Sequence, residues 1–225
     1  MQKNCLIVFV KFPEARGVKS RLASRLGERQ ARQLYRRFVE DLLDNLDEGD
    51  YFLKLFFYPP CSRKEITRWL GGGRSYEPQS GEDLGERMKN AFEKCFSDGF
   101  ERAILIGSDS PDLPRAIVEA GFTALASRDA VIGPACDGGY YLIGFRAATF
   151  LPAPFSDIAW STAEVLKDTL AVLDGKGLKW AALPTWGDID TYEDLKRCIE
   201  INRKTKFAQS RTVRYALSRC GKIHF

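Results

Sequence analysis

The sequence holds a single histidine, His224, which is the next-to-last of its 225 residues. A Ser-His-Asp or Cys-His nucleophile and a poly-histidine metal site would each depend on that terminal residue, so these classes of enzyme are disfavoured. The six cysteines are widely spaced and include no C-x-x-C pair, which argues against a zinc site or a disulfide framework. Any catalysis must therefore use carboxylates, Lys or Arg, hydroxyls or a bound metal.

The sequence also lacks a long apolar run. No stretch approaches the ~20 residues that a membrane-spanning helix needs, so we expect no membrane span. The N-terminal apolar run has no small-residue cleavage site, and we interpret it as a first strand of a cytoplasmic protein rather than as a signal peptide. Hydrophobic residues make up 44% and charged residues 28% of the chain, which is typical of a globular domain.

Positive charge is concentrated near the C-terminus. The net charge is +4, but residues 201–225 carry seven Lys and Arg and no acid, so residues 1–200 are slightly acidic. A docked or solvated segment is the commoner explanation of such a tail, and we expect no nucleic-acid partner. We therefore predict one domain at 1–200 and a basic C-terminal segment at 201–225.

Strand-like and helix-like patterns alternate along most of the chain. Predicted strands lie at 5–10, 51–58, 74–77, 102–106, 130–132, 140–145 and 178–182, predicted helices at 28–46, 63–70, 84–96, 114–126, 162–173 and 192–201, and a loop at 11–27. Such alternation forms a mostly parallel sheet with helices on both faces, so we expect an α/β fold with one three-layer α/β/α domain. Ligands of such sheets bind at the C-terminal ends of the strands.

The loop after the first strand carries Gly17, Lys19 and Arg21 and leads into a helical segment. A flexible loop with two cations can bind a phosphate, although a solvated surface loop is the alternative. The loop is not a P-loop, because Val18 separates the glycine from the lysine and Phe12 stands where the earlier glycine belongs. No G-x-G-x-x-G motif occurs either, which disfavours a dinucleotide-binding fold.

An acidic turn at 107–112 follows the apolar strand at 102–106. Asp109 lies where sheet geometry directs side chains into the binding crevice, and carboxylate oxygens suit Mg²⁺ or Mn²⁺. The alternative is that Asp109 and Asp112 form turns and cap the next helix. We favour Asp109 as a metal ligand.

A second acidic group follows the last predicted strand. Asp188 and Asp190 point the same way if the segment is extended, because side-chain direction repeats every two residues. Thr191 and Asp194 resemble a capping box at the start of a helix, which explains both by local structure. Asp190 has no such explanation and is the candidate second metal ligand.

Two further loops are rich in glycine and polar residues. In the loop at 133–141, Gly138 and Gly139 permit a close ligand approach or simply a tight turn, and Asp137 beside them could hold a hydroxyl-bearing substrate. The segment at 79–88 is a similar polar approach to a helix and is ambiguous by itself.

Taken in order, these segments resemble a bacterial family of GT-A-like proteins that is related to nucleotide-diphospho-sugar transferases and small nucleotidyltransferases. The matching segments are 19–22, 81–88, 106–113, 133–144, 157–162 and 188–195, within residues 4 to 200. The glycine of the first loop stands one place later than in relatives and Ser20 replaces the customary Thr, so the nucleotide preference could differ. Ser110 stands where relatives commonly have Cys, so no catalytic thiol is inferred.

The resemblance implies a GT-A-type domain whose first loop contacts a nucleotide and whose Asp109, with Asp190, holds Mg²⁺ or Mn²⁺. On this basis we expect nucleotide and phosphate contacts from Lys11, Gly17, Lys19, Ser20, Arg21, Gln79 and Arg87, and a substrate pocket formed by Gly138, Gly139, Tyr140, Trp160 and Ser161. The expected partners are a nucleotide or nucleotide-sugar substrate and an acceptor that the sequence does not identify.

Three functions fit this set of residues. The favoured hypothesis is a metal-dependent glycosyltransferase that uses a nucleotide-diphospho-sugar, with Asp137 as a catalytic base for the acceptor hydroxyl. Aromatic faces and a carboxylate suit a sugar ring, and between 130 and 161 only Arg146 is basic. The alternatives are a nucleotidyltransferase that joins a nucleoside triphosphate to a phosphorylated acceptor, and a non-catalytic nucleotide-binding protein.

Overall fold

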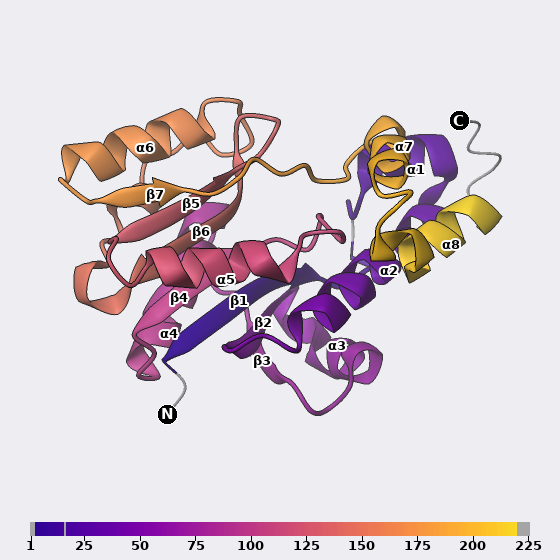
Figure 1. Cartoon of the computed structure of the whole chain (residues 1–225). Coiled ribbons are helices and arrows are strands. Elements are labelled where there is room, and N and C mark those ends of the chain that lie inside the picture. Colours follow the sequence, from indigo (N-terminus) through magenta and orange to yellow (C-terminus); the bar gives the residue numbers. More distant parts are fainter. Residues whose placement is uncertain (1–2, 16, 220–225) are drawn as a thin grey trace.

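The computed structural model describes residues 3–15 and 17–219, so residues 220–225 of the predicted basic segment, with His224, lie outside the described part. The seven strands are β1 (Asn4–Lys11), β2 (Phe52–Tyr58), β3 (Ser75–Pro78), β4 (Arg102–Ile106), β5 (Ala130–Pro134), β6 (Tyr140–Arg146) and β7 (Trp180–Ala182) (Figure 1). The α-helices are α1 (Ser20–Leu26), α2 (Glu28–Leu46), α3 (Arg63–Leu70), α4 (Leu84–Ser97), α5 (Arg115–Ala124), α6 (Val165–Gly175), α7 (Tyr192–Ile201) and α8 (Arg211–Arg219). Short 3₁₀ turns lie at η1 (Pro60–Ser62), η2 (Ala147–Thr149), η3 (Ala153–Phe155) and η4 (Lys206–Gln209).

The strands form one sheet in the order β3-β2-β1-β4-β6-β5-β7. Strand β6 is antiparallel to both β4 and β5, whereas all other neighbouring pairs are parallel. Since β6 runs against its neighbours, its first residues lie at the edge where the parallel strands end, with Leu142 beside Ile106. The loop before β6 therefore shares that edge with the loops after β1 and β4.

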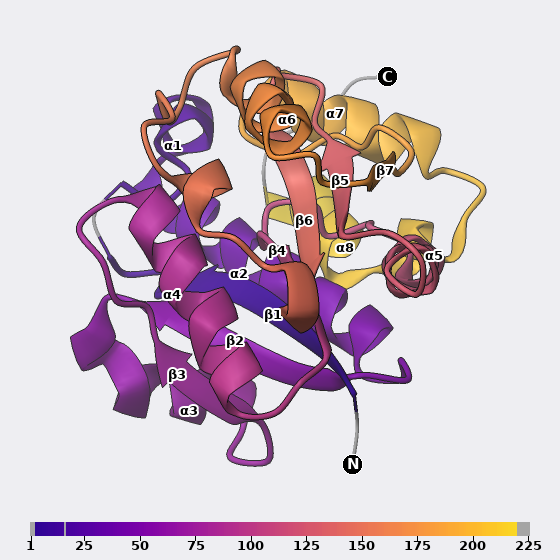
Figure 2. The ribbon, with the colours of Figure 1, turned by 90° about the vertical axis from the view of Figure 1, so that its left-hand side faces the viewer.

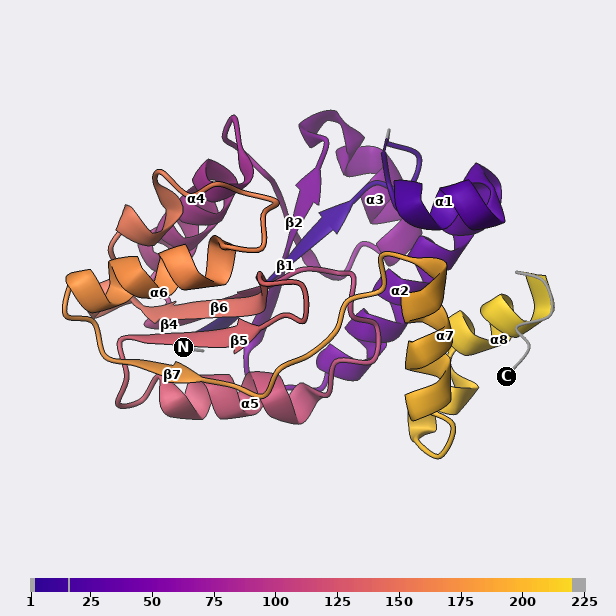
Figure 3. The same cartoon turned by 90° about the horizontal axis from the view of Figure 1, so that it is seen from above.

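Two apolar clusters lie on opposite faces of the sheet. Along β1, Leu6, Val8 and Val10 pack in the cluster with α2, α3 and α5, whereas Cys5 and Ile7 pack in the cluster with α4 and α6. This alternation follows from the two-residue period of a strand. Figures 2 and 3 show α4 and α6 on one side of the sheet and α5 on the other. The three-layer α/β/α fold predicted from the sequence is confirmed.

The predicted uninterrupted loop at 11–27 is wrong, because α1 occupies its second half. This helix has seven residues and only Leu22 is buried, so it gives no apolar period. It also begins after Lys19 without a side-chain cap, and the usual sequence signal for a helix start is missing. Within the described residues, no helix combines the length and the apolar character needed to cross a membrane.

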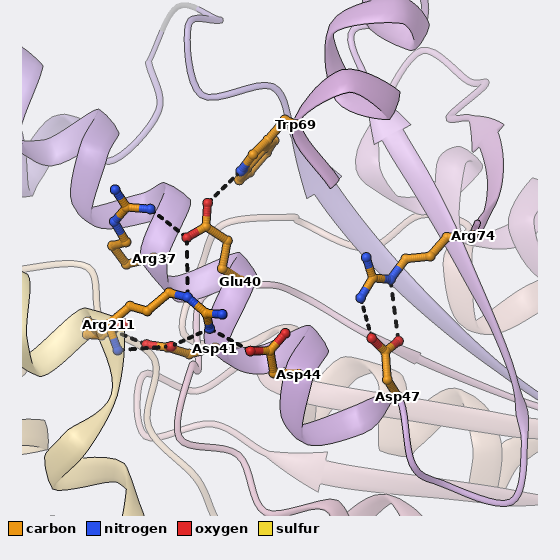
Figure 4. A network of polar contacts seen from close by, with 9 residues as sticks. Arg37, Glu40, Asp41, Asp44, Asp47, Trp69, Arg74 and Arg211 are labelled. Atoms are coloured by element: carbon orange, nitrogen blue, oxygen red, sulfur yellow. Dashed lines mark hydrogen bonds and ion pairs between the residues drawn. The ribbon is translucent and has the colours of Figure 1, made fainter. Parts of the chain in front are cut away.

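Helix α8, which the sequence analysis did not predict, packs on α2 through Asp41 (Figure 4). The Asp41 carboxylate accepts hydrogen bonds from the backbone N–H groups of Arg211 (3.1 Å) and Thr212 (2.7 Å), so it caps the start of α8. The Arg211 guanidinium also pairs with Asp41 (3.3 Å) and Asp44 (2.5 Å). At least this part of the predicted segment 201–225 is docked on the domain.

We expect the substitution Asp41→Ala to lower the free energy of unfolding by about 2 kcal/mol, because it removes a helix cap and leaves the buried N–H of Thr212 without an acceptor. Urea denaturation of the variant and the wild type measures this difference. The matched control is Asp44→Ala: its side chain is 56% exposed, and we expect a loss within about 0.5 kcal/mol. Equal losses for the two variants would contradict the capping role of Asp41.

Candidate functional site

A cavity of about 790 Å³ opens at the C-terminal ends of β1 and β4. The neighbouring strands β2 and β4 lie on opposite sides of β1, so this is the point of the sheet where ligands of α/β proteins bind. The cavity lining includes almost all residues that the sequence analysis selected, namely Lys11, Gly17, Lys19, Ser20, Arg21, Gln79, Arg87, Asp109, Asp137, Gly139, Tyr140, Trp160, Ser161 and Asp190. The roles of these residues stay predictions, but the fold brings them together around one cavity.

The ammonium group of Lys19 lies between the two candidate metal ligands. Its Nζ atom is 2.7 Å from Asp109 Oδ1 and 2.8 Å from Asp190 Oδ1. The backbone N–H of Ile189 donates to the carbonyl of Asp109 (2.9 Å), which holds the two acidic segments side by side. The Lys19 side chain is 4% exposed, whereas the side chains of Asp109 and Asp190 are 45% and 41% exposed. The lysine is thus buried behind two carboxylates that face the cavity.

These contacts determine the charge states of the cluster. Burial by itself lowers the pKa of Lys19, but the charges and hydrogen bonds of Asp109 and Asp190 outweigh it and raise that pKa above its ordinary value. Burial by itself raises the pKa of Asp190, and the Lys19 ammonium reverses this effect and lowers it. Lys19 and Asp190 are therefore both charged at neutral pH.

The Tyr35 hydroxyl of α2 links the end of β1 to the acidic turn, a role that the sequence does not predict. Its hydroxyl accepts a hydrogen bond from the backbone N–H of Lys11 (2.9 Å) and shares another with Ser108 Oγ (2.8 Å). Burial and the charge of Asp109 raise the pKa of Tyr35, so the hydroxyl stays protonated. In the sequence Tyr35 is an apolar-face residue of an amphipathic helix, and no local signal marks it as part of a site.

Gln79 and Arg87 are held by the chain around them. The buried Gln79 side chain donates from Nε2 to the carbonyl of Phe56 (2.9 Å), and its oxygen has no partner among residues 3–15 and 17–219. Because Gln79 lines the cavity, this acceptor is available to a ligand. The Arg87 guanidinium donates to the carbonyl of Gly81 (3.0 Å) and lies 4.4 Å from the ring centre of Tyr58. Arg87 thereby orders the loop before α4.

Two glycines allow close approaches that shape the cavity wall. Gly138 has φ +91°, and a Cβ there would lie 2.3 Å from the carbonyl oxygen of Ala163. Gly138 does not line the cavity; its own carbonyl accepts a hydrogen bond from Leu166 N (2.9 Å) and so fixes the loop against α6. A Cβ on Gly85 would lie 2.7 Å from Nε1 of Trp160, which packs over the start of α4. Glycine at both positions is thus explained by packing.

Unusual backbone conformations surround the same cavity. In the described part of the chain, the non-glycine residues with positive φ are Lys19 (53°), Asp157 (59°) and Ser161 (66°). Lys19 and Ser161 line the cavity, and Asp157 begins the segment that leads to Ser161. Such conformations cost energy and persist where surrounding contacts enforce them, which is typical of functional sites.

The remaining predictions about acidic residues have mixed outcomes. The capping box at the start of α7 is confirmed, since Thr191 Oγ1 accepts from Asp194 N and the Asp194 carboxylate accepts from Thr191 N. Asp112 does not cap α5, because the residue before that helix is Pro114 and no side chain caps it. The Asp112 carboxylate instead accepts hydrogen bonds from Trp186 Nε1 (3.1 Å) and Asn202 Nδ2 (2.7 Å).

The ionised form of Asp188 is unfavourable in this fold, which the sequence does not predict. Burial, together with the negative charges of Asp190 and Asp137, raises its pKa to about 6. The fold therefore favours the protonated form of Asp188. The contribution of Asp188 to the free energy of unfolding is fully present below the ordinary pKa of 3.8 and is lost as the pH rises through about 6. Asp137 itself is exposed, and its Oδ1 accepts a hydrogen bond from Gly139 N (3.0 Å).

We expect Asp188→Asn to stabilise the metal-free protein at pH 7, because an amide has no charge to bury beside the neighbouring carboxylates. A gain of about 2 to 4 °C in Tm corresponds to roughly 1 kcal/mol in a chain of this size. At pH 4, where Asp188 is already protonated in the fold, the two proteins should melt together. Thermal unfolding in the presence of EDTA measures both values, and an equal Tm at pH 7 would refute the assigned cost.

The class that the fold and the site define is an α/β protein with a ligand cavity at the C-terminal edge of its sheet. Residues 42–162 match a family described as an uncharacterized protein conserved in bacteria (DUF2064). The chain is 40% identical to a candidate nucleotide-diphospho-sugar transferase from Desulfovibrio desulfuricans G20, with a TM-score of 0.92 over 96% of this chain and 94% of that one. The chain belongs to this bacterial family.

More distant solved structures share the fold. A CMP:2-keto-3-deoxy-manno-octonic acid synthetase in complex with CTP is 11% identical, with a TM-score of 0.55 over 90% of this chain and 99% of that one. Rv0371c from Mycobacterium tuberculosis H37Rv, in complex with manganese, is 13% identical, with a TM-score of 0.54 over 88% and 98%. None of the curated proteins matches this sequence. The comparisons confirm the predicted family and fold class and indicate an enzyme of the transferase kind.

Proposed function

We propose that this protein is a metal-dependent glycosyltransferase whose donor is a nucleotide-diphospho-sugar. The observation that carries the proposal is the composition of one cavity. Two half-exposed carboxylates, Asp109 and Asp190, line it together with Lys11, Lys19 and Arg21. A cation-poor wall with Asp137 and aromatic side chains also lines it. The family relative named as a candidate nucleotide-diphospho-sugar transferase supports the same reaction class.

Lys11 at the end of β1 and Arg21 in α1 are cations suited to a diphosphate. Lys11 and Arg21 both line the cavity, and Arg21 is 74% exposed with its Nη1 4.0 Å from Asp190 Oδ2, so its guanidinium is free to take a phosphate oxygen. Preorganised positive charge at this place would stabilise the negative charge that develops on a leaving nucleoside diphosphate. Lys19 also lines the cavity, although its ammonium is engaged by two carboxylates.

The carboxylates of Asp109 and Asp190 suit a divalent cation. Within residues 3–15 and 17–219 no cluster of three or more His, Cys, Asp and Glu side chains forms a metal cage. Mg²⁺ is commonly bound by one or two carboxylates together with substrate phosphates, so Asp109 and Asp190 are a sufficient protein contribution. When bound, Mg²⁺ or Mn²⁺ would neutralise charge on the diphosphate. A protein of the same fold is known in complex with manganese.

The cavity wall that contains Asp137, Tyr140 and Trp160 favours a sugar over a second phosphate. Tyr140 and Trp160 offer apolar faces there, and Asp137 is the exposed carboxylate. Arg146, the one basic residue between 130 and 161, pairs in register with Arg102 at the opposite end of β4. A phosphorylated acceptor would therefore find little positive charge on this wall, which disfavours the nucleotidyltransferase alternative.

The proposed transfer needs one proton acceptor. The acceptor hydroxyl oxygen forms a bond to the anomeric carbon while the bond from that carbon to the diphosphate oxygen breaks, and the hydroxyl proton passes to Asp137. One oxygen of Asp137 already accepts from Gly139 N, which fixes the carboxylate and leaves the other oxygen for the proton. A positioned carboxylate base of this kind contributes about 10²- to 10⁴-fold to a rate.

We expect the protein, incubated with Mn²⁺ and a panel of nucleotide sugars, to release a nucleoside diphosphate, including by slow hydrolysis without acceptor. Asp137→Asn should lower kcat for sugar transfer by about 10²-fold or more with little change in KM for the donor. Pyrophosphate release from a nucleoside triphosphate plus a sugar phosphate, with no diphosphate from any nucleotide sugar, would instead establish nucleotidyl transfer.

The phosphate contacts can be tested separately from turnover. The double substitution Lys11→Met and Arg21→Met should weaken binding of nucleoside diphosphates by about 10-fold or more, because charge-assisted hydrogen bonds are lost. The control removes the same charge from the basic C-terminal segment, through Lys204→Met and Arg214→Met, and should leave the affinity nearly unchanged. Isothermal titration calorimetry gives both values, and the reverse order would assign anion binding to the C-terminal segment.

A further inference from the structure

The Lys19 ammonium occupies the position between the two carboxylates that are proposed to bind the metal. Its Nζ atom is 2.7 Å from Asp109 Oδ1 and 2.8 Å from Asp190 Oδ1. We propose that Lys19 is an internal counter-cation of the metal site, and that a divalent cation binds these two oxygens only by displacing the ammonium. The inference rests on the proposed function in one respect, which is that Asp109 and Asp190 are the metal ligands.

The Lys19 ammonium is held in place by contacts within the protein and is shielded from solvent. The Lys19 side chain is 4% exposed, its Nζ lies 5.9 Å from the ring centre of Phe38, and its backbone is left-handed at φ 53°. A left-handed conformation is unfavourable for lysine and is kept only where the surrounding contacts require it. Arg21, two residues further on, is 74% exposed and only 4.0 Å from Asp190. The two cations of the loop therefore have different roles.

A buried ammonium and a divalent cation exclude each other at the same two oxygens. Without a cation the two carboxylates would repel each other, so Lys19 compensates their charge in the metal-free protein. A divalent ion that arrives must break both ion pairs and leave the ammonium without an anionic partner, which lowers the intrinsic metal affinity. Asp109 and Asp190 are nearly half exposed, so the ion can reach them from the cavity.

The displaced ammonium requires a new anion, and the substrate phosphates can supply it. Lys19 lines the cavity together with Lys11 at the end of β1 and Arg21 in α1, so a diphosphate bound there would lie beside all three cations. Metal binding and phosphate binding are then coupled, and by thermodynamic linkage each must strengthen the other equally. The site would bind its metal together with the nucleotide and would be nearly metal-free when no nucleotide is bound.

The first test measures Mn²⁺ binding without nucleotide, by electron paramagnetic resonance of free Mn²⁺. Lys19→Met should bind Mn²⁺ about 10-fold or more tighter than the wild type, because no ammonium has to be displaced. The matched control Arg21→Met loses the same charge two residues further on, at an exposed position of α1, and should change the affinity by about threefold or less. Lys19→Gln, which keeps hydrogen-bond donors, replaces Lys19→Met if the latter does not fold.

The second test uses the wild-type protein and follows the amine itself. Acylation of lysines, mapped by mass spectrometry, should leave Lys19 protected without metal and modify it when Mn²⁺ is saturating, whereas the exposed Lys11 should react equally in both states. Protection of Lys19 at saturating Mn²⁺, or equal or weaker Mn²⁺ binding by the Lys19 variants, overturns the displacement while leaving the metal ligands intact. Absence of Mn²⁺ binding by every variant, with and without a nucleoside diphosphate, overturns the metal-dependent function as well.

Discussion

The ion pairs of Lys19 with Asp109 and Asp190 connect three parts of the chain that are far apart in sequence. A buried ammonium is costly to desolvate, so the first loop can adopt its position only if both carboxylates converge on it. The carboxylates in turn depend on the turn after β4 and on the segment after β7, which a backbone hydrogen bond from Ile189 to Asp109 holds together. The pairs thus fix the geometry of the cavity more than they add net stability.

The reversed direction of β6 determines what this cluster faces. If β6 were parallel to its neighbours, the loop before it would lie at the opposite edge of the sheet, far from the cluster. Because β6 is antiparallel, Asp137 and Gly139 line the same cavity as Asp109 and Lys19. One strand reversal therefore brings Asp137 and Tyr140 to the cavity that the cations before and within α1 also line. The proposed nucleotide-diphospho-sugar would contact both groups of residues.

Much of the fold and of the site could be predicted, because the informative signals are local. Asp109 follows an apolar strand, and ligands of α/β sheets bind at the C-terminal ends of the strands, so the sequence alone predicts Asp109 at the ligand site. The pairing of Lys19 with acids 90 and 171 residues away has no local signature, so the sequence indicated a free phosphate ligand rather than a buried counter-cation. The sequence likewise predicts Gly138 in the pocket, whereas the close approach of Ala163 that requires glycine there is a tertiary contact without a local signal.

The distribution of charge also limits the chemistry of the second substrate. The raised pKa of Asp188 reflects an acidic environment that includes Asp137 and Asp190, and this environment lies next to the wall formed before β6. An acceptor phosphate in that place would add further negative charge beside carboxylates, with Arg146 at the far end of its strand. A neutral polyhydroxyl group meets no such repulsion and can donate hydrogen bonds to the same carboxylates. This distribution of charge therefore supports the proposal of sugar transfer rather than of nucleotidyl transfer to a phosphate.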